Sequence, residues 1–239
     1  NNTMNPNFKV CVRVRPIDFN SRMIETINET SLSIKDATNK TSIEKQIYNF
    51  NMVWDHMAGQ DMIFQYTYEN AVQKVIEGNN ACVLSYGQTG GGKTYSMFGE
   101  DERYTVDNIK TYGENRKDRR GLVPRTVELL LQKNKEFQGL KEFVLTCNFA
   151  EIYLDQVRDL GKFIHETDKG GKSARGKTSN ALSMSSYENE NLEIYEHTNG
   201  QIMIRNITNV VIRSMDDLYA LLNAGFTLRD KYESKGNTQ

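Results

Sequence analysis

Eight residues, from Gly87 to Thr94, fit the phosphate-loop pattern G-x-x-x-x-G-K-[ST]. Glycines let such a loop turn tightly, so that several backbone N–H groups point at one anion, and a following helix adds the positive end of its dipole. In this arrangement Lys93 can reach the β- and γ-phosphates of a nucleotide, while the Thr94 hydroxyl can ligate Mg²⁺. The pattern therefore predicts phosphate binding by Gln88, Thr89, Gly90, Gly91, Gly92, Lys93 and Thr94.

The residues around this loop strengthen the prediction. The apolar run 81–84 precedes it and is typical of a strand buried on both faces of a parallel sheet, and a helix-competent segment follows it. Residues 171–178, GKSARGKT, fit the same pattern, but a polar approach precedes them and a Ser/Asn-rich stretch follows. We interpret this second match as a basic, flexible loop, because nothing around it would pre-organise the backbone amides.

Two arginines form a second candidate. Residues 8–15 alternate in character and are rich in β-branched side chains, which predicts a strand that Pro16 ends. Arg13 and Arg15 are two positions apart, so they lie on one face of that strand. They form either a solvated charged face or a pair that projects toward a ligand next to Pro16.

Composition limits the class of protein. The 239 residues suit one large domain or two small ones, and 30 basic residues nearly balance 31 acidic ones. No global field favours nucleic acid or a membrane, and no apolar run approaches membrane-spanning length. Three cysteines lie in apolar, strand-like runs without metal-ligand spacing, which indicates reduced core residues of a cytosolic protein: Cys11, Cys82 and Cys147.

Strands and helices that follow one another along the chain indicate an α/β architecture. Helices are predicted over 60–77, from 122 onward, and from 215 onward with Ser214 as N-cap. Strands are predicted at 31–35, 42–50, 143–152, 192–195, 201–204 and 210–213, with residues 157–160 leaving the sheet. Trp54 is interpreted as a core residue. Residues 100–120 are expected to form a surface loop, and residues 161–191 a flexible basic loop.

Several stretches together resemble the kinesin motor domain over nearly the whole chain, 1–239. The loop segment 86–99 is similar to the kinesin phosphate loop almost residue for residue. Further landmarks lie in the family's order along the chain: Val12-Arg13-Val14-Arg15-Pro16, Gly121-Leu122-Val123-Pro124-Arg125, Glu151-Ile152-Tyr153, Arg158-Asp159-Leu160 and residues 225–229.

The resemblance implies a phosphate-loop NTPase fold, with a central mixed β-sheet flanked by helices. It implies that Arg13, Arg15 and Pro16 line an adenine pocket, that Tyr95 packs against the base, and that ATP or ADP binds with Mg²⁺. The implied function is a microtubule-stimulated ATPase that couples hydrolysis to microtubule binding and movement, located on cytoplasmic microtubules or the spindle. The alternative is a non-motile microtubule-binding or scaffold kinesin that binds nucleotide for structure only.

The chain departs from the family pattern in two ways. Gly91 stands where kinesins usually carry a small hydroxyl or similar residue, so the empty loop should be more flexible. In the family's order, both nucleotide-sensing switches and the main microtubule-binding helix come after Gln239. We therefore expect the first part of a longer motor, with an incomplete C-terminal half and no catalytic residue of its own. By itself the chain should be inactive or nearly so.

The loop 161–191 lies where kinesins place a loop that faces the microtubule. Its basic side chains either contact the acidic tubulin surface or belong to a solvated, disordered loop: Lys162, Lys169, Lys172, Arg175 and Lys177. The resemblance implies nothing about oligomeric state, which depends on neck, stalk and tail sequences.

Overall fold

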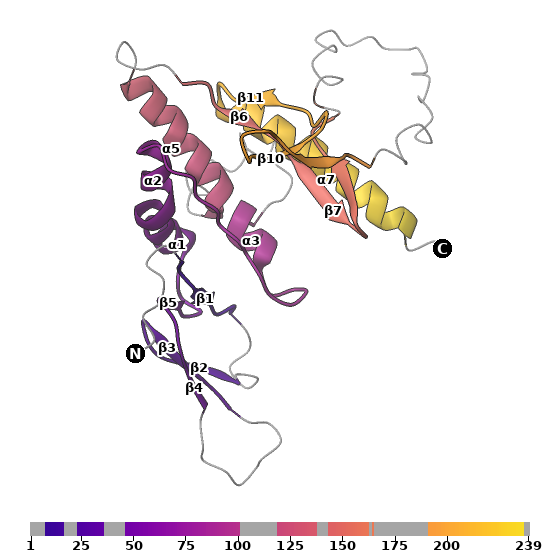
Figure 1. Ribbon diagram of the computed structural model, residues 1–239. Helices are drawn as coiled ribbons and strands as arrows, with labels where there is room; N and C mark the ends of the chain where they lie inside the picture. The colour runs from indigo at the N-terminus through magenta and orange to yellow at the C-terminus, as the bar shows by residue number, and fades with distance from the viewer. Residues whose placement is uncertain are drawn as a thin grey trace, which may run out of the picture. The chain divides into compact units, whose positions relative to one another are not determined.

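The computed structural model describes residues 8–16, 23–35, 46–100, 119–137, 143–162, 164 and 191–236. The chain divides into two compact units (Figure 1). The first contains residues 1–99 and 117–122, and the second contains residues 100–116 and 123–239. Parallel and antiparallel strand pairs occur together with helices, so the α/β class is confirmed. Among the described residues, the strands form five small sheets.

Two sheets form the strand part of the first unit. β1 (Cys11–Arg13) pairs in parallel with β5 (Met52–Trp54), as the side-by-side ribbons of Figure 1 show. β2 (Ile24–Asn28), β3 (Ser31–Ile34) and β4 (Gln46–Asn49) form an antiparallel sheet in that order. The sequence analysis predicted β1, β3 and β4, with longer bounds, but missed β2, whose residues are mostly exposed. Residues 42–45 of the predicted strand 42–50 lie outside the described residues.

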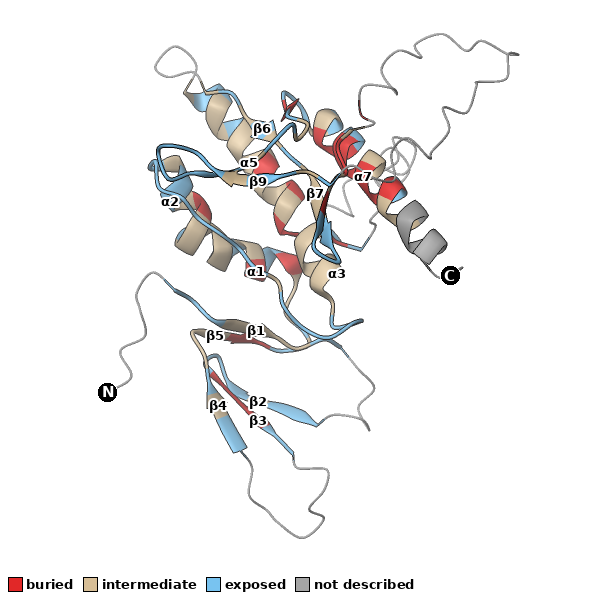
Figure 2. Ribbon diagram, turned by 45° about the vertical axis from the view of Figure 1, so that its right-hand side comes forward, coloured by how far each residue is buried: buried red, intermediate tan, exposed pale blue. Residues whose placement is uncertain are grey.

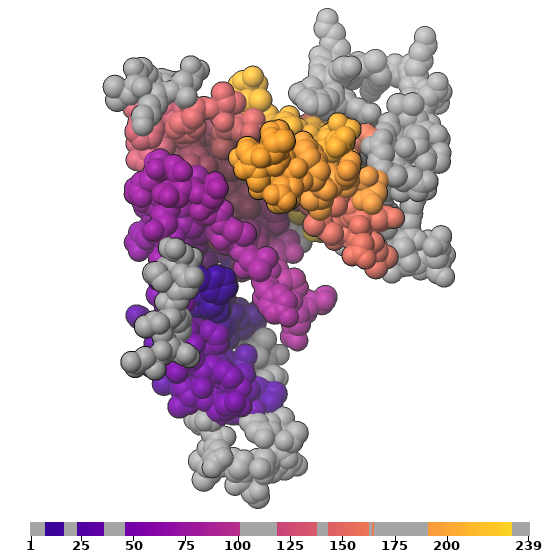
Figure 3. Space-filling view, in the orientation of Figure 1, coloured from indigo at the N-terminus to yellow at the C-terminus, as the bar shows by residue number. Residues whose placement is uncertain are grey.

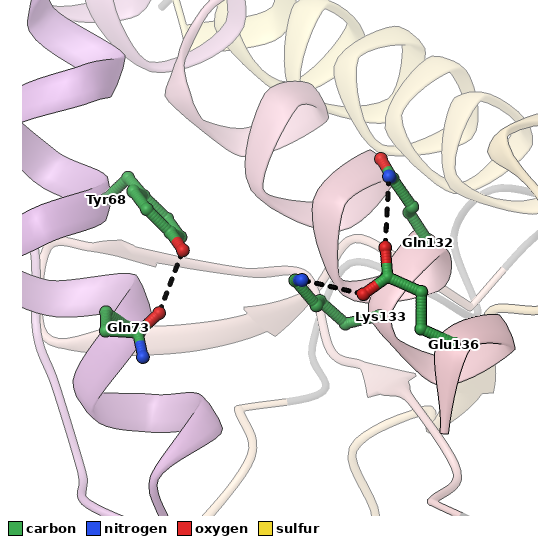
Figure 4. Close-up of polar contacts among 5 residues, drawn as sticks. All are labelled: Tyr68, Gln73, Gln132, Lys133 and Glu136. Carbon is green, nitrogen blue, oxygen red and sulfur yellow. Dashed lines mark hydrogen bonds and ion pairs between the residues drawn. The ribbon is translucent and has the colours of Figure 1, made fainter. Parts of the chain in front are cut away.

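One continuous helical stretch crosses the first unit, as predicted for residues 60–77. It consists of α1 (Gln60–Thr67), a π-helical turn η2 (Tyr68–Val72) and α2 (Gln73–Ile76). The Tyr68 hydroxyl donates a hydrogen bond of 2.9 Å to Gln73 Oε1 within this stretch (Figure 4). The helix ends before Gly78, whose φ of +94° lies in the left-handed region that glycine adopts without strain.

The core of the first unit gathers around Trp54, Ile63 and Leu122. Trp54 is 9% exposed and packs edge-on against Tyr66, with ring centroids 5.5 Å apart. The expectation that the single tryptophan is a core residue is thus confirmed. The short helix α3 (Lys93–Phe98) contributes Met97 to the same cluster, which ties the phosphate-loop segment to the core of this unit.

The predicted buried strand at residues 81–84 is wrong. Residues 79–87 have no strand assignment, and the side chains of Val83 and Leu84 are 43% and 83% exposed. An apolar run becomes a buried strand only where neighbouring strands pair with it, and no strand of the described ranges does so. The expectation that Cys82 is a core residue is wrong for the same reason, because Cys82 is exposed. Cys11 and Cys147 are half-buried.

The second unit contains most of α5 (Leu122–Glu136) and six short strands. Near the end of α5, Lys133 and Gln132 donate hydrogen bonds of 2.7 Å and 3.2 Å to Glu136 (Figure 4). The bond from Lys133 is the main cause that lowers the pKa of Glu136. This pairing leaves a basic and an acidic side chain neutralising one another on the exposed end of the helix.

The strands of the second unit pair in three antiparallel couples. β6 (Thr146–Cys147) pairs with β11 (Val210–Val211), β7 (Ala150–Tyr153) with β8 (Gln156–Asp159), and β9 (Ile194–Glu196) with β10 (Ile202–Ile204). The predicted long strand 143–152 is interrupted between β6 and β7, which pair with different partners. Residues 156–159 form β8 and do not leave the sheet, which corrects a second expectation.

The long helix α7 (Met215–Gly236) closes the second unit and begins, as predicted, directly after Ser214. The Ser214 hydroxyl accepts the N–H of Asp217 at 3.3 Å, and the Asp217 carboxylate accepts the N–H of Ser214 at 2.9 Å. A stripe along the helix is buried, shown red in Figure 2, and includes the four predicted core residues Leu218, Leu221, Leu222 and Phe226.

No helix among the described residues is long and apolar enough to cross a membrane.

Candidate functional site

The phosphate-loop segment forms a glycine-rich turn at the surface of the first unit (Figure 3, magenta). The Gly91 N–H donates to the Gln88 carbonyl at 3.0 Å, which closes the turn. Gly90 and Gly92 have φ angles of +76° and +92°, in the region that side-chain-bearing residues rarely adopt. The helix α3 starts immediately afterwards at Lys93. The loop conformation thus depends on the glycines that the sequence pattern specifies.

Lys93 lies folded over its own loop. Its ammonium donates hydrogen bonds of 2.8 Å and 2.9 Å to the backbone carbonyls of Gly87 and Gln88. These carbonyls are neutral acceptors, whereas a phosphate oxygen carries charge and forms roughly twice as strong a bond. An anion in the loop would therefore compete successfully for this ammonium. Thr94 follows in the first turn of α3 and is half-buried.

Arg13 in β1 reaches the helix α3, and Arg15 after β1 reaches the phosphate-loop segment. The exposed Arg15 donates from Nη1 to the carbonyl of Gly90. Arg13 donates from Nη1 to Ser96 Oγ at 2.9 Å, and its guanidinium carbon lies 4.8 Å from the centre of the Tyr95 ring. Both side chains therefore have defined contacts near the loop, and their role toward a ligand stays a prediction.

The environment of Arg13 is partly desolvated. Burial lowers the pKa of Arg13 from its ordinary value, because desolvation disfavours the charged form, and the neighbouring Tyr95 opposes this shift. The guanidinium stays protonated near neutral pH, because the ordinary pKa of arginine lies far above that range. A charge in such a position is stabilised by its hydrogen-bond acceptors and by the aromatic face beneath it.

Gln60 is a site residue that the sequence analysis missed. It begins α1, is only 2% exposed, and accepts a hydrogen bond of 2.9 Å from Arg13 Nη1. Its Nε2 donates to the Tyr95 carbonyl at 2.7 Å and lies 3.5 Å from the Arg119 carbonyl. A glutamine at a helix start gives no local signal of burial, so only the three-dimensional arrangement identifies it.

The two ends of the segment 100–120 meet beside α3. Gly99 and Arg120 form an isolated antiparallel bridge. A side chain at Gly99 would lie 3.0 Å from the Arg120 Cα, so the close approach requires glycine there. Residues 101–118 of the expected surface loop lie outside the described residues.

The remaining predicted residues are only partly placed. Pro16 is exposed next to Arg15, and Gln88, Thr89 and Gly90 are exposed in the loop. Lys162 is half-buried shortly after β8. The other four basic residues, Lys169, Lys172, Arg175 and Lys177, and the second pattern match 171–178 lie outside the described residues. In the part of the chain that is described, no group of three or more His, Cys, Asp or Glu could hold a metal ion.

Comparison with known proteins gives one consistent result. The kinesin-like protein KIN-12F of Arabidopsis thaliana is 29% identical over 230 residues, which are 94% of this chain and 17% of the plant protein. The kinesin heavy chain of Syncephalastrum racemosum is 28% identical over 223 residues, which are 92% of this chain and 20% of the fungal protein. The solved structure of a fast kinesin matches with a TM-score of 0.69 at 21% identity, and the match covers 94% of this chain and 54% of that one. The family model described as the kinesin motor domain matches residues 11–239, and the chain therefore belongs to the kinesin motor domain family.

Proposed function

We propose that this chain binds ATP or ADP together with Mg²⁺ at the phosphate-loop segment 87–94. The loop amides and Lys93 would hold the phosphates, and the Thr94 hydroxyl would ligate Mg²⁺. Supporting this, the loop has the glycine conformations of the pattern and leads directly into α3. The family match over residues 11–239 points the same way.

The adenine would pack against Tyr95, beside Arg13, Arg15 and Pro16. Tyr95 is 39% exposed, so part of its ring is open to solvent, and the Arg13 guanidinium lies over the same ring. Aromatic and proline rings present flat apolar surfaces on which a base can stack. The observation that carries this part is the convergence of Arg13 and Arg15 on the segment 90–96.

The activity we propose is that of a microtubule-based motor, in which ATP hydrolysis is coupled to microtubule binding and movement in the complete motor. The support is family membership and the intact Lys93-Thr94 pair. Tubulin is then the partner, and the cytoskeleton the location. The 239-residue chain alone is expected to turn over little ATP, because the resemblance assigns to it no residue that positions the attacking water.

The test is a titration of the chain with fluorescently labelled ADP in the presence of Mg²⁺. Lys93→Ala should weaken binding at least about tenfold, as expected for the loss of a charged hydrogen bond. Lys177→Ala is the matched control, because Lys177 is the equivalent lysine of the second pattern match, 171–178. Equal loss from both variants, or loss only from Lys177→Ala, would refute the assignment of the loop.

The tubulin contact proposed for the basic loop needs a separate experiment. Glutamate would replace the five basic residues together, and binding would be measured by co-sedimentation with microtubules at several salt concentrations. The proposal expects weaker binding and a shallower salt dependence. Unchanged affinity and salt dependence would show that the segment is only a solvated loop. The residues replaced are Lys162, Lys169, Lys172, Arg175 and Lys177.

A further inference from the structure

The buried side-chain amide of Gln60 contacts two residues of the candidate adenine site, Arg13 and Tyr95. Gln60 is 2% exposed, and both ends of its side-chain amide are hydrogen-bonded within the first unit. Its oxygen accepts from Arg13 at 2.9 Å, and its nitrogen donates to the Tyr95 carbonyl at 2.7 Å. Gln60 thereby joins β1 to the helix α3, two elements that are far apart in sequence.

The chemistry of these partners fixes the orientation of the amide. A guanidinium can only donate, and a backbone carbonyl can only accept. Of the neutral side chains, only an amide offers an acceptor and a donor at the same end of a chain of this length. A glutamate would repel the Tyr95 carbonyl, and an apolar residue would leave both buried partners unsatisfied, which is costly in a dry environment.

The position of Arg13 follows from this contact. Gln60 and Ser96 both accept from Arg13 Nη1 at 2.9 Å, so the guanidinium is held from two sides. It lies 4.8 Å from the centre of the Tyr95 ring and covers one face of it. A planar base that packs on Tyr95 must then use the part of the ring that Arg13 leaves open.

We propose that Gln60 is a positioning residue for the base-binding part of the nucleotide site. It locks Arg13 against Tyr95 and fixes the backbone of Tyr95, so that the aromatic ring is held ready for an adenine before the nucleotide arrives. The inference rests on the proposed nucleotide binding at the loop, and it adds a residue whose side-chain hydrogen bonds go to Arg13, Tyr95 and Arg119. Pre-organisation of this kind lowers the entropic cost of binding.

We expect that replacing Gln60 lowers the affinity for ADP but leaves the affinity for pyrophosphate nearly unchanged. Isothermal titration calorimetry would compare Mg-ADP with Mg-pyrophosphate, which carries phosphates but no base. Gln60→Met keeps the side-chain length and removes both hydrogen bonds, and it should weaken ADP binding about tenfold. Pyrophosphate binding should change less than about twofold, because the phosphate contacts are made elsewhere.

Matched variants separate this role from general destabilisation. Gln65→Met is the control, since Gln65 lies on the same helix α1 but is exposed, and its side-chain amide donates to the exposed Glu69. It should leave the affinities for both ligands unchanged. If Gln60→Met does not fold, Gln60→Asn, one carbon shorter, should give the same selective loss with a smaller magnitude. In an Arg13→Ala background, the effect of Gln60→Met should be smaller than in the wild type, because only the hydrogen bonds that the amide nitrogen donates to backbone carbonyls are then left to lose.

The outcomes distinguish the two proposals. If Lys93→Ala leaves the binding of ADP and pyrophosphate intact, the proposed nucleotide site is refuted. If Lys93→Ala abolishes both while Gln60→Met weakens both equally, or weakens neither, the loop binds phosphate but Gln60 has no positioning role toward the base.

Discussion

Replacing Gly225 by alanine tests the packing of the second unit. Gly225 lies on the buried side of α7, where a Cβ would overlap the ring carbons Cδ1 and Cε1 of Phe149 and lie 3.3 Å from the Cβ of Leu160. The same Phe149 ring packs edge-on against Phe226, with centroids 5.5 Å apart. A methyl group at this position must therefore displace an aromatic ring that already has a partner.

The change in the free energy of unfolding combines two destabilising effects and one stabilising effect. Overpacking a core costs about 1–3 kcal/mol, and disturbing an aromatic pair costs about 0.5–1.5 kcal/mol. Alanine in a helix interior regains about 0.5–1 kcal/mol over glycine. We expect a net loss of about 2 kcal/mol, which is about a 30-fold change in the folding equilibrium and lowers Tm by about 4–8 °C in a chain of this size.

Thermal denaturation followed by circular dichroism measures this change. Ala224→Gly is the control, because it reports the helix-propensity term alone at the neighbouring position of α7, about 1 kcal/mol. Adding Phe149→Leu to Gly225→Ala should recover part of the lost stability by removing the overlapped ring atoms. A Tm that rises in Gly225→Ala would mean that Gly225 is an ordinary helix glycine, and would refute the packing described for this unit.

Three further predictions concern the thiols and a helix cap. At neutral pH a thiol reagent should modify the exposed Cys82 first, and Cys82→Ser should remove that fast phase. Burial raises the pKa of the Cys11 and Cys147 thiols above 9.0, so the folded state holds these protons more tightly than the unfolded state. Their contribution to stability should be complete below pH 9 and lost as the pH rises further, and Cys→Ser variants measured by urea denaturation should reduce that loss. Ser214→Ala should destabilise α7 by about 1 kcal/mol in the same assay, while an unchanged midpoint would show that Asp217 caps the helix alone.

Features encoded by nearby residues were predictable from the sequence. The helical stretch 60–76 and α7 follow from apolar periodicity, and the start of α7 follows from Ser214 with acidic residues behind it. The turn between β9 and β10 contains Asn199-Gly200, and Gly200 has the positive φ that such turns require. In each case the deciding interactions lie within a few residues of one another.

Features that depend on distant partners were not predictable. The run 81–84 has the composition of a buried strand, yet Leu84 is 83% exposed. The segment 143–152 reads as one strand, but its halves pair with β11 and β8, which lie in different parts of the sequence. Strand formation is decided by pairing and burial, which local composition does not contain.

Some residues of the candidate site could likewise be proposed from the sequence, and others could not. The phosphate-loop segment was proposed as a site from residue types and spacing, because loop chemistry requires them at fixed positions, and Arg13 and Arg15 were proposed from their spacing on a predicted strand. Gln60 acts through contacts with residues 47 and 35 positions away, Arg13 and Tyr95, so no local pattern marks it. The resemblance also assigns Arg15 to the adenine pocket, which stays a prediction, and the structure shows its guanidinium donating to the Gly90 carbonyl of the loop.

Photolabelling with 8-azido-ADP and Mg²⁺, followed by mass spectrometry of the peptides, tests the central claim most directly. The azide attached to the base should label the peptide that contains Tyr95, and excess unlabelled ADP should prevent that labelling. Label in the peptide 171–178, or label at Tyr95 that ADP does not prevent, would contradict the assignment of the nucleotide site to the loop 87–94.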